Sequence, residues 1–138
     1  MARTLGIDYG RVRVGFAVSD ELGIISTPLD VATVSGMTQA VAASTDRLRQ
    51  TDATEIVVGQ PLNMDGSESE LSREVELFID KLKQVTDAPI HQWDERMTSM
   101  QAERVLIEGN VSREKRKKVK DKLAAQLILQ SYLDSKSF

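Results

Sequence analysis

The amino-acid sequence predicts an α/β fold, a mixed five-stranded sheet flanked by helices. Three short apolar segments separated by polar turns open the chain, a pattern typical of an antiparallel meander. Amphipathic segments of helical length then alternate with short apolar segments, as they do in βαβ units with parallel strands. The run Ile56–Val58 is apolar without interruption, which indicates a strand that is buried on both faces.

Each element follows from apolar periodicity and from turn or capping residues at its ends. The expected strands are Thr4–Asp8, Arg13–Ser19, Ile24–Leu29, Ile56–Val58 and Ile90–Trp93. The expected helices are 36–51, 70–85, a third from Thr98 or Ser99 to Gly109, and a last one that Ser112 caps and that ends near Asp134. No repeat, linker or low-complexity segment interrupts this order, so we expect a single domain over residues 1–138.

The composition restricts the chemistry that is available. With no cysteine and a single histidine, His91, the chain cannot build a thiolate zinc site or a multi-histidine metal site. A metal would have to be held mainly by carboxylates, which favours Mg²⁺ or Mn²⁺. The net charge of -3 argues against a wholly basic nucleic-acid binder but leaves room for a local basic face. The amino terminus lacks the apolar run of a signal peptide and no segment is long enough to span a membrane, so we expect a cytoplasmic protein.

Acidic residues stand where a purely structural protein would have little use for them. Asp8 ends the first strand, Asp94 and Glu95 end the fifth, and Asp121 is in the last helix. Strand-end acids from the middle of a mixed sheet can converge with an acid from a helix that lies on the sheet. Such a carboxylate cluster suits two-metal phosphodiester hydrolysis, which needs no histidine or cysteine nucleophile.

In the last helix, Asp121 is expected to face the sheet. Helical periodicity places it on one face with Ala125, Ile128 and Tyr132, the face expected to pack on the sheet. A buried carboxylate without a partner costs several kcal/mol or changes its pKa, and a shared divalent cation would compensate it.

Simpler interpretations of these acids remain open at this point. Asp121 could pair with a neighbouring lysine (Lys117, Lys118 or Lys122), and Asp8 could be an ordinary turn residue before Gly10. Asp94 and Glu95 could form a solvated strand end. Because side chains alternate along a strand, only one of these two acids can join the cluster unless the strand has already ended. The other could anchor Arg96 or cap the next helix.

A basic segment adjoins Asp121. It contains Arg113, Lys115, Arg116, Lys117, Lys118, Lys120 and Lys122, while Arg11 and Arg13 flank the first turn near Asp8. Such a run is usually a solvated helix face, but positive charge beside carboxylates is also what a phosphate backbone requires. Aromatic residues make up only 4% of the chain, so a platform for base stacking has little support.

Four segments, in order and spread over nearly the whole chain, resemble the YqgF-type nucleases, small relatives of ribonuclease H and of the RuvC Holliday-junction resolvases. They are LGIDYGRVRVGFAVSD, VGQPLNMDGS, WDERMTS and KVKDKLAAQLILQSYL. Each motif alone is weak, but the four together are highly specific. The chain departs from the pattern at Val12, where many relatives carry a basic residue.

The resemblance implies a ribonuclease H-like fold and a metal-dependent nuclease. It implies that Asp8, Glu95 and Asp121 hold two ions of Mg²⁺ or Mn²⁺ and are catalytic, with Asp94 as the alternative to Glu95. It further implies maturation of the 5′ end of small-subunit (16S) ribosomal RNA, with RNA favoured over DNA as partner and ribosomal precursor particles as the setting. The loop from Gly59 to Gly66 would line the substrate groove. The residues expected to contact nucleic acid are Arg11, Arg13, Asn63, Arg96, Arg113, Lys115, Arg116, Lys117 and Lys118.

Three other functions compete with RNA processing. A RuvC-like resolvase would cut four-way DNA junctions as a dimer with paired sites, and the sequence indicates no oligomeric state. A non-catalytic RNA-binding assembly factor could keep the same fold, although the retained acids argue against it. Actin-like kinases also open with a strand of the form GIDxG, but they need two such domains, more than 138 residues provide.

Overall fold

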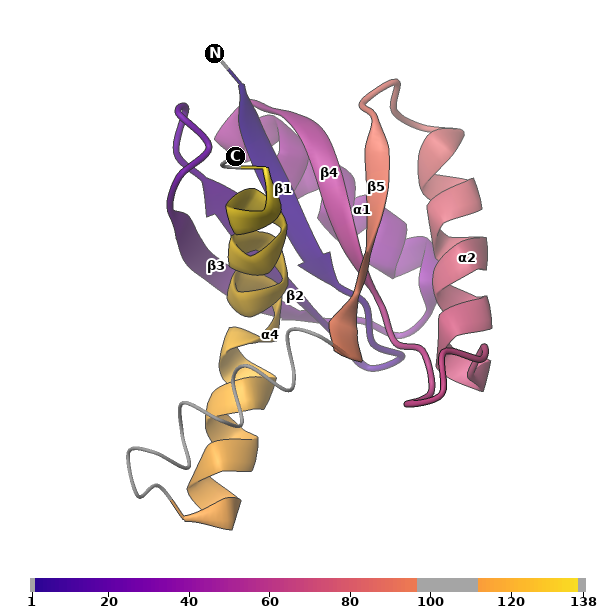
Figure 1. Cartoon of the computed structure of the whole chain (residues 1–138). Coiled ribbons are helices and arrows are strands. Elements are labelled where there is room, and N and C mark those ends of the chain that lie inside the picture. The colour runs from indigo at the N-terminus through magenta and orange to yellow at the C-terminus, as the bar shows by residue number, and fades with distance from the viewer. Residues whose placement is uncertain (1, 97–111, 137–138) are drawn as a thin grey trace.

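The computed structural model describes residues 2–96 and 112–136 (Figure 1). Within the last helix, the side chains of Arg113 and of residues 116–122 lie outside this description. The helix expected from Thr98 or Ser99 to Gly109 falls entirely outside it. Along the described parts of the chain, no helix is both long and apolar enough to cross a membrane.

The predicted mixed sheet is confirmed, with five strands in the order β3-β2-β1-β4-β5. The strands are β1 (Arg3–Asp8), β2 (Arg13–Ser19), β3 (Ser26–Thr33), β4 (Ala53–Gln60) and β5 (Ile90–Asp94). β1, β2 and β3 form the antiparallel meander, while β4 and β5 run parallel to β1. The carboxyl ends of β1, β4 and β5 therefore meet at one edge of the sheet, where the strand-end acids lie.

The predicted bounds of the third strand are wrong, because β3 begins at Ser26 rather than Ile24 and extends to Thr33. The Asp20 carboxylate accepts hydrogen bonds from the backbone N–H groups of Ile24 (2.7 Å) and Ile25 (3.0 Å), which holds these residues in a turn. At its other end, β3 continues antiparallel to the start of β2, with Thr33 opposite Arg13. Pro28 is tolerated within β3 because β3 is an edge strand.

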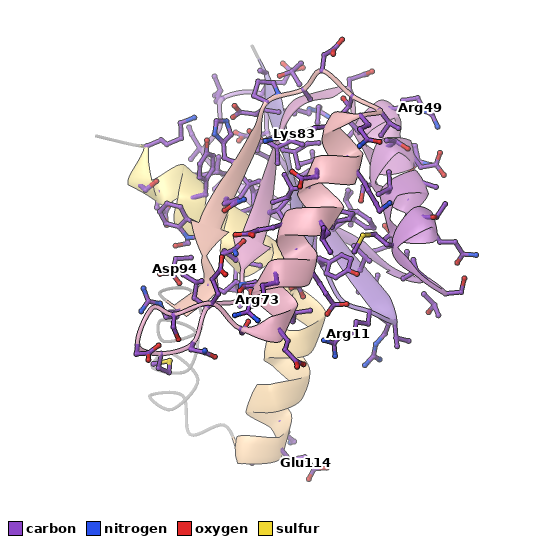
Figure 2. All side chains as sticks on the ribbon, turned by 90° about the vertical axis from the view of Figure 1, so that its right-hand side faces the viewer. Arg11, Arg49, Arg73, Lys83, Asp94 and Glu114 are labelled. Carbon is purple, nitrogen blue, oxygen red and sulfur yellow. The ribbon has the colours of Figure 1, made fainter. Side chains whose placement is uncertain are left out.

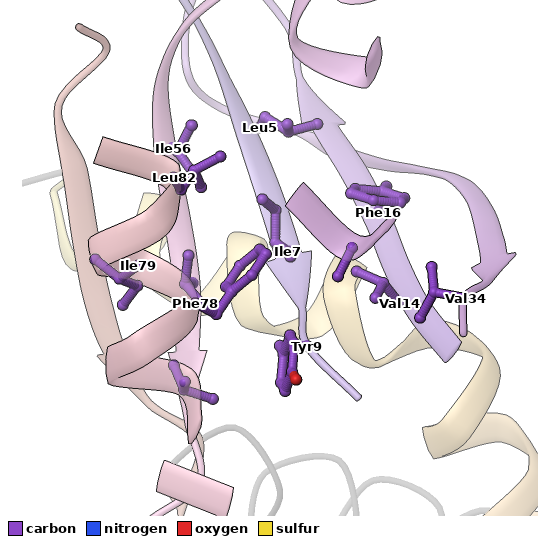
Figure 3. Packing of buried hydrophobic residues seen from close by; sticks show 13 residues of the cluster. Leu5, Ile7, Tyr9, Val14, Phe16, Val34, Ile56, Phe78, Ile79 and Leu82 are labelled. Carbon is purple, nitrogen blue, oxygen red and sulfur yellow. The ribbon is translucent and has the colours of Figure 1, made fainter. Parts of the chain in front are cut away.

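Helices cover both faces of the sheet (Figure 1). On one face lie α1 (Met37–Thr51) and α2 (Glu70–Lys83), and on the other lies α4 (Arg113–Ser135). Figure 3 shows Phe78 and Leu82 of α2 packed toward Leu5 and Ile7 of β1 and Ile56 of β4, all of them buried. This face supplies most of the hydrophobic core, and burying it is the main term that stabilises the sheet.

The carboxyl-terminal half of α4 is fastened to the sheet at both edges. The Gln130 side chain donates to the carbonyl of Ile24 (2.9 Å) and accepts from the N–H of Ser26 (2.9 Å) beside β3. On the opposite side, the Trp93 indole of β5 donates to the Ser131 hydroxyl (3.0 Å). The other half of α4 extends past the sheet (Figure 1), and Asp121 occurs between the two halves in sequence.

The helix α4 approaches β1 closely because β1 has a glycine at the crossing point. A Cβ added to Gly6 would lie 2.8 Å from Leu129 Cβ and 3.2 Å from the Ala125 carbonyl oxygen. We expect Gly6→Ala to lower the free energy of unfolding by about 1–3 kcal/mol through overpacking. The matched control is Gly15→Ala in β2, whose new Cβ would make ordinary contacts of 3.7 Å and more. Urea denaturation of both variants measures the difference, and equal stabilities would contradict the close approach.

Candidate active site

Asp8 and Glu95 come together at the carboxyl edge of the sheet, on the face that α4 covers. Asp8 is the last residue of β1 and lies opposite Gly15 of β2. A Cβ on Gly15 would lie 3.8 Å from Asp8 Cβ and 3.7 Å from Ala125 Cβ, so these three residues are neighbours. A hydrogen bond joins the carboxyl groups of Asp8 and Glu95. Asp8 thus lies on the face of the sheet that α4 covers, close to Ala125.

Glu95 reaches this position because β5 ends at Asp94. The Asp94 carboxylate accepts a hydrogen bond from the backbone N–H of Arg96 (2.9 Å), which turns the chain at Glu95. Side-chain alternation along the strand therefore no longer applies to Glu95. Asp94 instead pairs with the guanidinium of Arg96, at 2.6 Å between Oδ2 and Nη2. Of the two adjacent acids, the structure brings Glu95 to Asp8.

Gly59, near the end of β4, makes room for the Glu95 side chain. A Cβ at this position would lie 2.9 Å from both Cγ and Cδ of Glu95 and 2.6 Å from Ile128 Cδ1 of α4. The sequence predicted Gly59 only as the start of a loop, whereas it lies inside β4 and touches Glu95. A glycine within a strand is the signal that could have indicated this close approach.

Burial and mutual repulsion disfavour ionisation of the carboxyl pair. Burial, the negative charge of Asp8, the hydrogen bond with Asp8 and the charge of Asp94 together raise the pKa of Glu95 to about 8. By contrast, the hydrogen bonds from Arg96 outweigh partial burial and lower the pKa of Asp94. The pKa values of Asp94 and Glu95 are therefore shifted in opposite directions. At neutral pH without a cation, the Asp8–Glu95 pair retains a proton.

The carboxylate pair fits a hard divalent cation, because oxygen ligands with shared negative charge are what Mg²⁺ and Mn²⁺ prefer. Among the residues whose side chains are described, no group of three or more metal-ligating side chains comes together. The third acid expected, Asp121, lies in α4 one helical turn before Ala125, and its side chain is outside the described part. The sheet-facing residues of its predicted face, Ala125, Ile128 and Tyr132, are buried as expected.

Some of the basic side chains expected to contact nucleic acid form ion pairs within the protein, whereas others are exposed. The Arg11 side chain forms an ion pair with Glu74 of α2 at 2.6 Å, and Arg96 is bound to Asp94. Arg13 and Lys115 are exposed, and the side chains of Arg113, Arg116, Lys117 and Lys118 are not among those described. Figure 2 shows Arg11 and Asp94 toward the same end of the domain, with Glu114 beyond them at the start of α4.

Asn63 organises its own loop. Its side-chain amide donates to the Ser67 hydroxyl (3.0 Å) and to the Glu68 carbonyl (3.2 Å). Its backbone carbonyl accepts from the N–H of Gly66 (2.9 Å), a residue with a positive φ of 88°. The segment that the sequence predicted as a substrate-lining loop is therefore an ordered turn rather than a loose connection.

We expect Gly59→Ala to damage the site more than the fold. The added methyl group would displace the Glu95 side chain from Asp8 and press on Ile128. If Glu95 is a metal ligand, as the resemblance implies, its displacement should lower nuclease activity by roughly 10–100-fold, with about 1–3 kcal/mol lost from the free energy of unfolding. The Gly6→Ala variant, which presses on Leu129 and Ala125 of α4 rather than on Glu95, serves as the control for overpacking alone. Cleavage assays and urea denaturation separate the two effects, and unchanged activity would show that Glu95 does not need this space.

The arrangement of strands and helices is that of ribonuclease H-like proteins. The structure of Thermus thermophilus RuvC with a Holliday junction is similar, with a TM-score of 0.60, 16% identity and coverage of 99% of this chain and 97% of that one. The Fowlpox virus resolvase, solved with Holliday junction DNA, is similar with a TM-score of 0.53 and 10% identity, and covers 99% of each chain. At these identities the likeness establishes the fold.

Sequence comparison identifies the family. Residues 2–135 match the RuvX family, which is described as "Holliday junction resolvase". The chain belongs to this family, which confirms the resemblance found in the motifs. Relatives from Endomicrobium trichonymphae and Protochlamydia amoebophila are 44% and 46% identical to it, over 99% and 98% of this chain and 99% and 95% of theirs. A relative from Geobacillus kaustophilus is 45% identical over 97% of this chain and 99% of its own length. All three carry the name "Putative pre-16S rRNA nuclease".

Proposed function

We propose that this protein is a metal-dependent nuclease that trims the 5′ end of the precursor of 16S ribosomal RNA in the cytoplasm. The observation that carries the proposal is the Asp8–Glu95 pair at the sheet edge, where the pKa of Glu95 is raised to about 8. Two carboxyl groups held together against their mutual repulsion are more typical of a cation-binding site than of a purely structural one. Family membership and the names of close relatives favour RNA as substrate.

In this proposal Asp8, Glu95 and Asp121 hold one or two ions of Mg²⁺ or Mn²⁺. When bound, divalent cations lower the pKa of the attacking water and stabilise the leaving oxygen of the phosphodiester. Asp8 is held by the end of β1, and Glu95 by the turn at Asp94 and by the space at Gly59. Preorganised carboxylates of this kind keep the reacting groups in position without reorganisation during the reaction.

Positive charge beside the carboxylates would bind the phosphate backbone. Arg13 and Lys115 are exposed, and we assign the same role to Arg113, Arg116, Lys117 and Lys118 of α4. The half of α4 that extends past the sheet would carry these residues along the nucleic acid (Figure 1). Binding by such contacts weakens steeply with added salt.

Cleavage of four-way DNA junctions is the second candidate, because the family description and the fold of RuvC both point to it. The test is a parallel assay of a 16S rRNA precursor and a four-way DNA junction with the purified protein in Mg²⁺ or Mn²⁺. We expect cutting at the 5′ end of the RNA, and none after chelation of the metal. Specific cutting of the junction alone would overturn the ranking, and binding of the RNA without cleavage under any metal would favour an assembly factor.

A further inference from the structure

Arg96 was expected to contact nucleic acid, but its guanidinium is already committed within the protein. Its Nε donates to both oxygens of Asp94, at 2.9 and 3.1 Å, and its Nη2 donates to Oδ2 at 2.6 Å. Its Nη1 donates to the backbone carbonyl of Met64 at 3.0 Å. The side chain is 30% exposed. A guanidinium that is hydrogen-bonded on two sides in this way has a fixed orientation.

The Met64 carbonyl belongs to a loop that is ordered by its own hydrogen bonds. The site loop, residues 61–67, is closed by bonds from Gly66 N–H to the Asn63 carbonyl (2.9 Å) and from Asn63 N–H to the Ser67 carbonyl (3.0 Å). The Asp65 carboxylate also accepts from the N–H of Ser67 at 2.9 Å. The site loop is therefore a preformed unit, and Arg96 joins this unit to the end of β5.

Gly66 fixes the shape of the site loop beside Arg96. It adopts a positive φ of 88°, which favours glycine, and a Cβ at this position would be in ordinary contact with Arg96 Nη1 at 3.4 Å. The Met64 carbonyl accepts the hydrogen bond from Arg96, while Met64 as a whole residue is 73% exposed. An exposed apolar side chain on an ordered loop that contacts Arg96 is available to a base or sugar of bound nucleic acid.

We propose that Arg96 is a positioning residue, which holds the site loop against the end of β5 so that the loop and Glu95 keep a fixed spacing for the substrate. The inference rests on the proposed nuclease function. The same guanidinium secures Asp94, whose carboxylate turns the chain at Glu95. One side chain thus links the orientation of Glu95 to the position of a loop more than 30 residues away in sequence.

Two other roles for Arg96 predict different results. A phosphate contact would contribute about 0.7–0.9 to the slope of log Kd against log salt, and a lysine would replace much of its charge. A surface ion pair without functional role would leave both loop and activity unchanged. A positioning residue needs the planar fork, so Arg96→Lys should behave like Arg96→Gln.

The experiment compares Arg96→Gln and Arg96→Lys with Arg49→Gln, a matched loss of charge on α1 at the opposite end of the domain (Figure 2). Arg13→Gln serves as the reference for loss of a phosphate contact. Three quantities are measured: hydrogen exchange of amides 63–67, the salt dependence of binding to a dye-labelled hairpin from the 16S rRNA precursor, and kcat and KM for its cleavage.

For both Arg96 variants we expect faster exchange in the site loop, an unchanged salt slope and a loss of roughly tenfold in kcat/KM, mainly in kcat. A slope lowered by about 0.7–0.9 in Arg96→Gln and restored in Arg96→Lys would overturn the proposal in favour of a phosphate contact. Exchange and kinetics equal to those of Arg49→Gln would overturn it in favour of a plain ion pair. If the wild-type protein cleaves nothing, the nuclease function fails, while the exchange data still decide whether Arg96 holds the loop.

Discussion

Asp8→Asn should abolish cleavage while making the metal-free protein more stable. The substitution keeps the shape of the side chain but removes one charge of the carboxyl pair. If the pair holds the ions, the loss of several kcal/mol of transition-state stabilisation should lower kcat by about 10³-fold or more. At the same time Glu95 loses a repelling neighbour that raises its pKa. A residue that only supports the fold would show the opposite sign in stability.

The neighbouring acids provide the controls for this experiment. Glu95→Gln should match Asp8→Asn, whereas Asp94→Asn should cost only about tenfold, because Asp94 contacts Arg96 rather than Asp8. Asp46→Asn on α1 removes a charge far from the site and accounts for non-specific effects of charge. Activities come from cleavage of the 16S rRNA precursor and stabilities from thermal melts in EDTA. Full activity of Asp8→Asn would exclude the proposed site, and a larger loss in Asp94→Asn than in Glu95→Gln would assign the metal to Asp94.

Local patterns were sufficient to predict most elements of the fold. Apolar periodicity identified β2 with its bounds, and Ser112 was recognised as the cap of α4, where its hydroxyl accepts from the N–H of Lys115 at 3.3 Å. The start of β3 was missed because the Asp20 side chain competes with the strand for two backbone N–H groups. β4 extends beyond its apolar run because β1 and β5 supply hydrogen-bond partners on both sides.

The candidate site was only partly accessible from sequence. The acids could be found because each stands at the end of an apolar strand or on an apolar helix face. The choice of Glu95 over Asp94 needed the family motif, since the turn that frees Glu95 depends on a hydrogen bond between Asp94 and Arg96. The close approach of Ile128 to Gly59 and the hydrogen bond from Arg96 to Met64 were missed, because only the fold brings these residues together.

The carboxyl pair should also make the metal-free protein less stable as the pH rises through neutrality. In the folded protein the pKa of Glu95 is about 8, against an ordinary value of 4.5. Between these values the folded state binds a proton that the unfolded state has released, so the free energy of unfolding falls with increasing pH, by at most about 1.4 kcal/mol per pH unit. Carboxyl groups with lowered pKa values, such as Asp30 and Asp94, make the free energy of unfolding depend on pH only around and below their ordinary pKa of 3.8. They therefore do not alter the trend that Glu95 produces between pH 4.5 and about 8.

Divalent metal should reverse this trend. To bind Mg²⁺ or Mn²⁺, the pair must release its proton, so the apparent affinity should rise up to tenfold per pH unit until the pH reaches about 8. At a fixed millimolar concentration of Mn²⁺, stabilisation by the metal should therefore be several degrees larger at pH 8 than at pH 6. Thermal melts at the two values, with Mn²⁺ and with EDTA, measure it. Asp8→Asn should lose most of the response to metal and flatten the EDTA profile. A metal shift that is equal at both pH values, or unchanged in Asp8→Asn, would mean that the ion binds somewhere other than this pair.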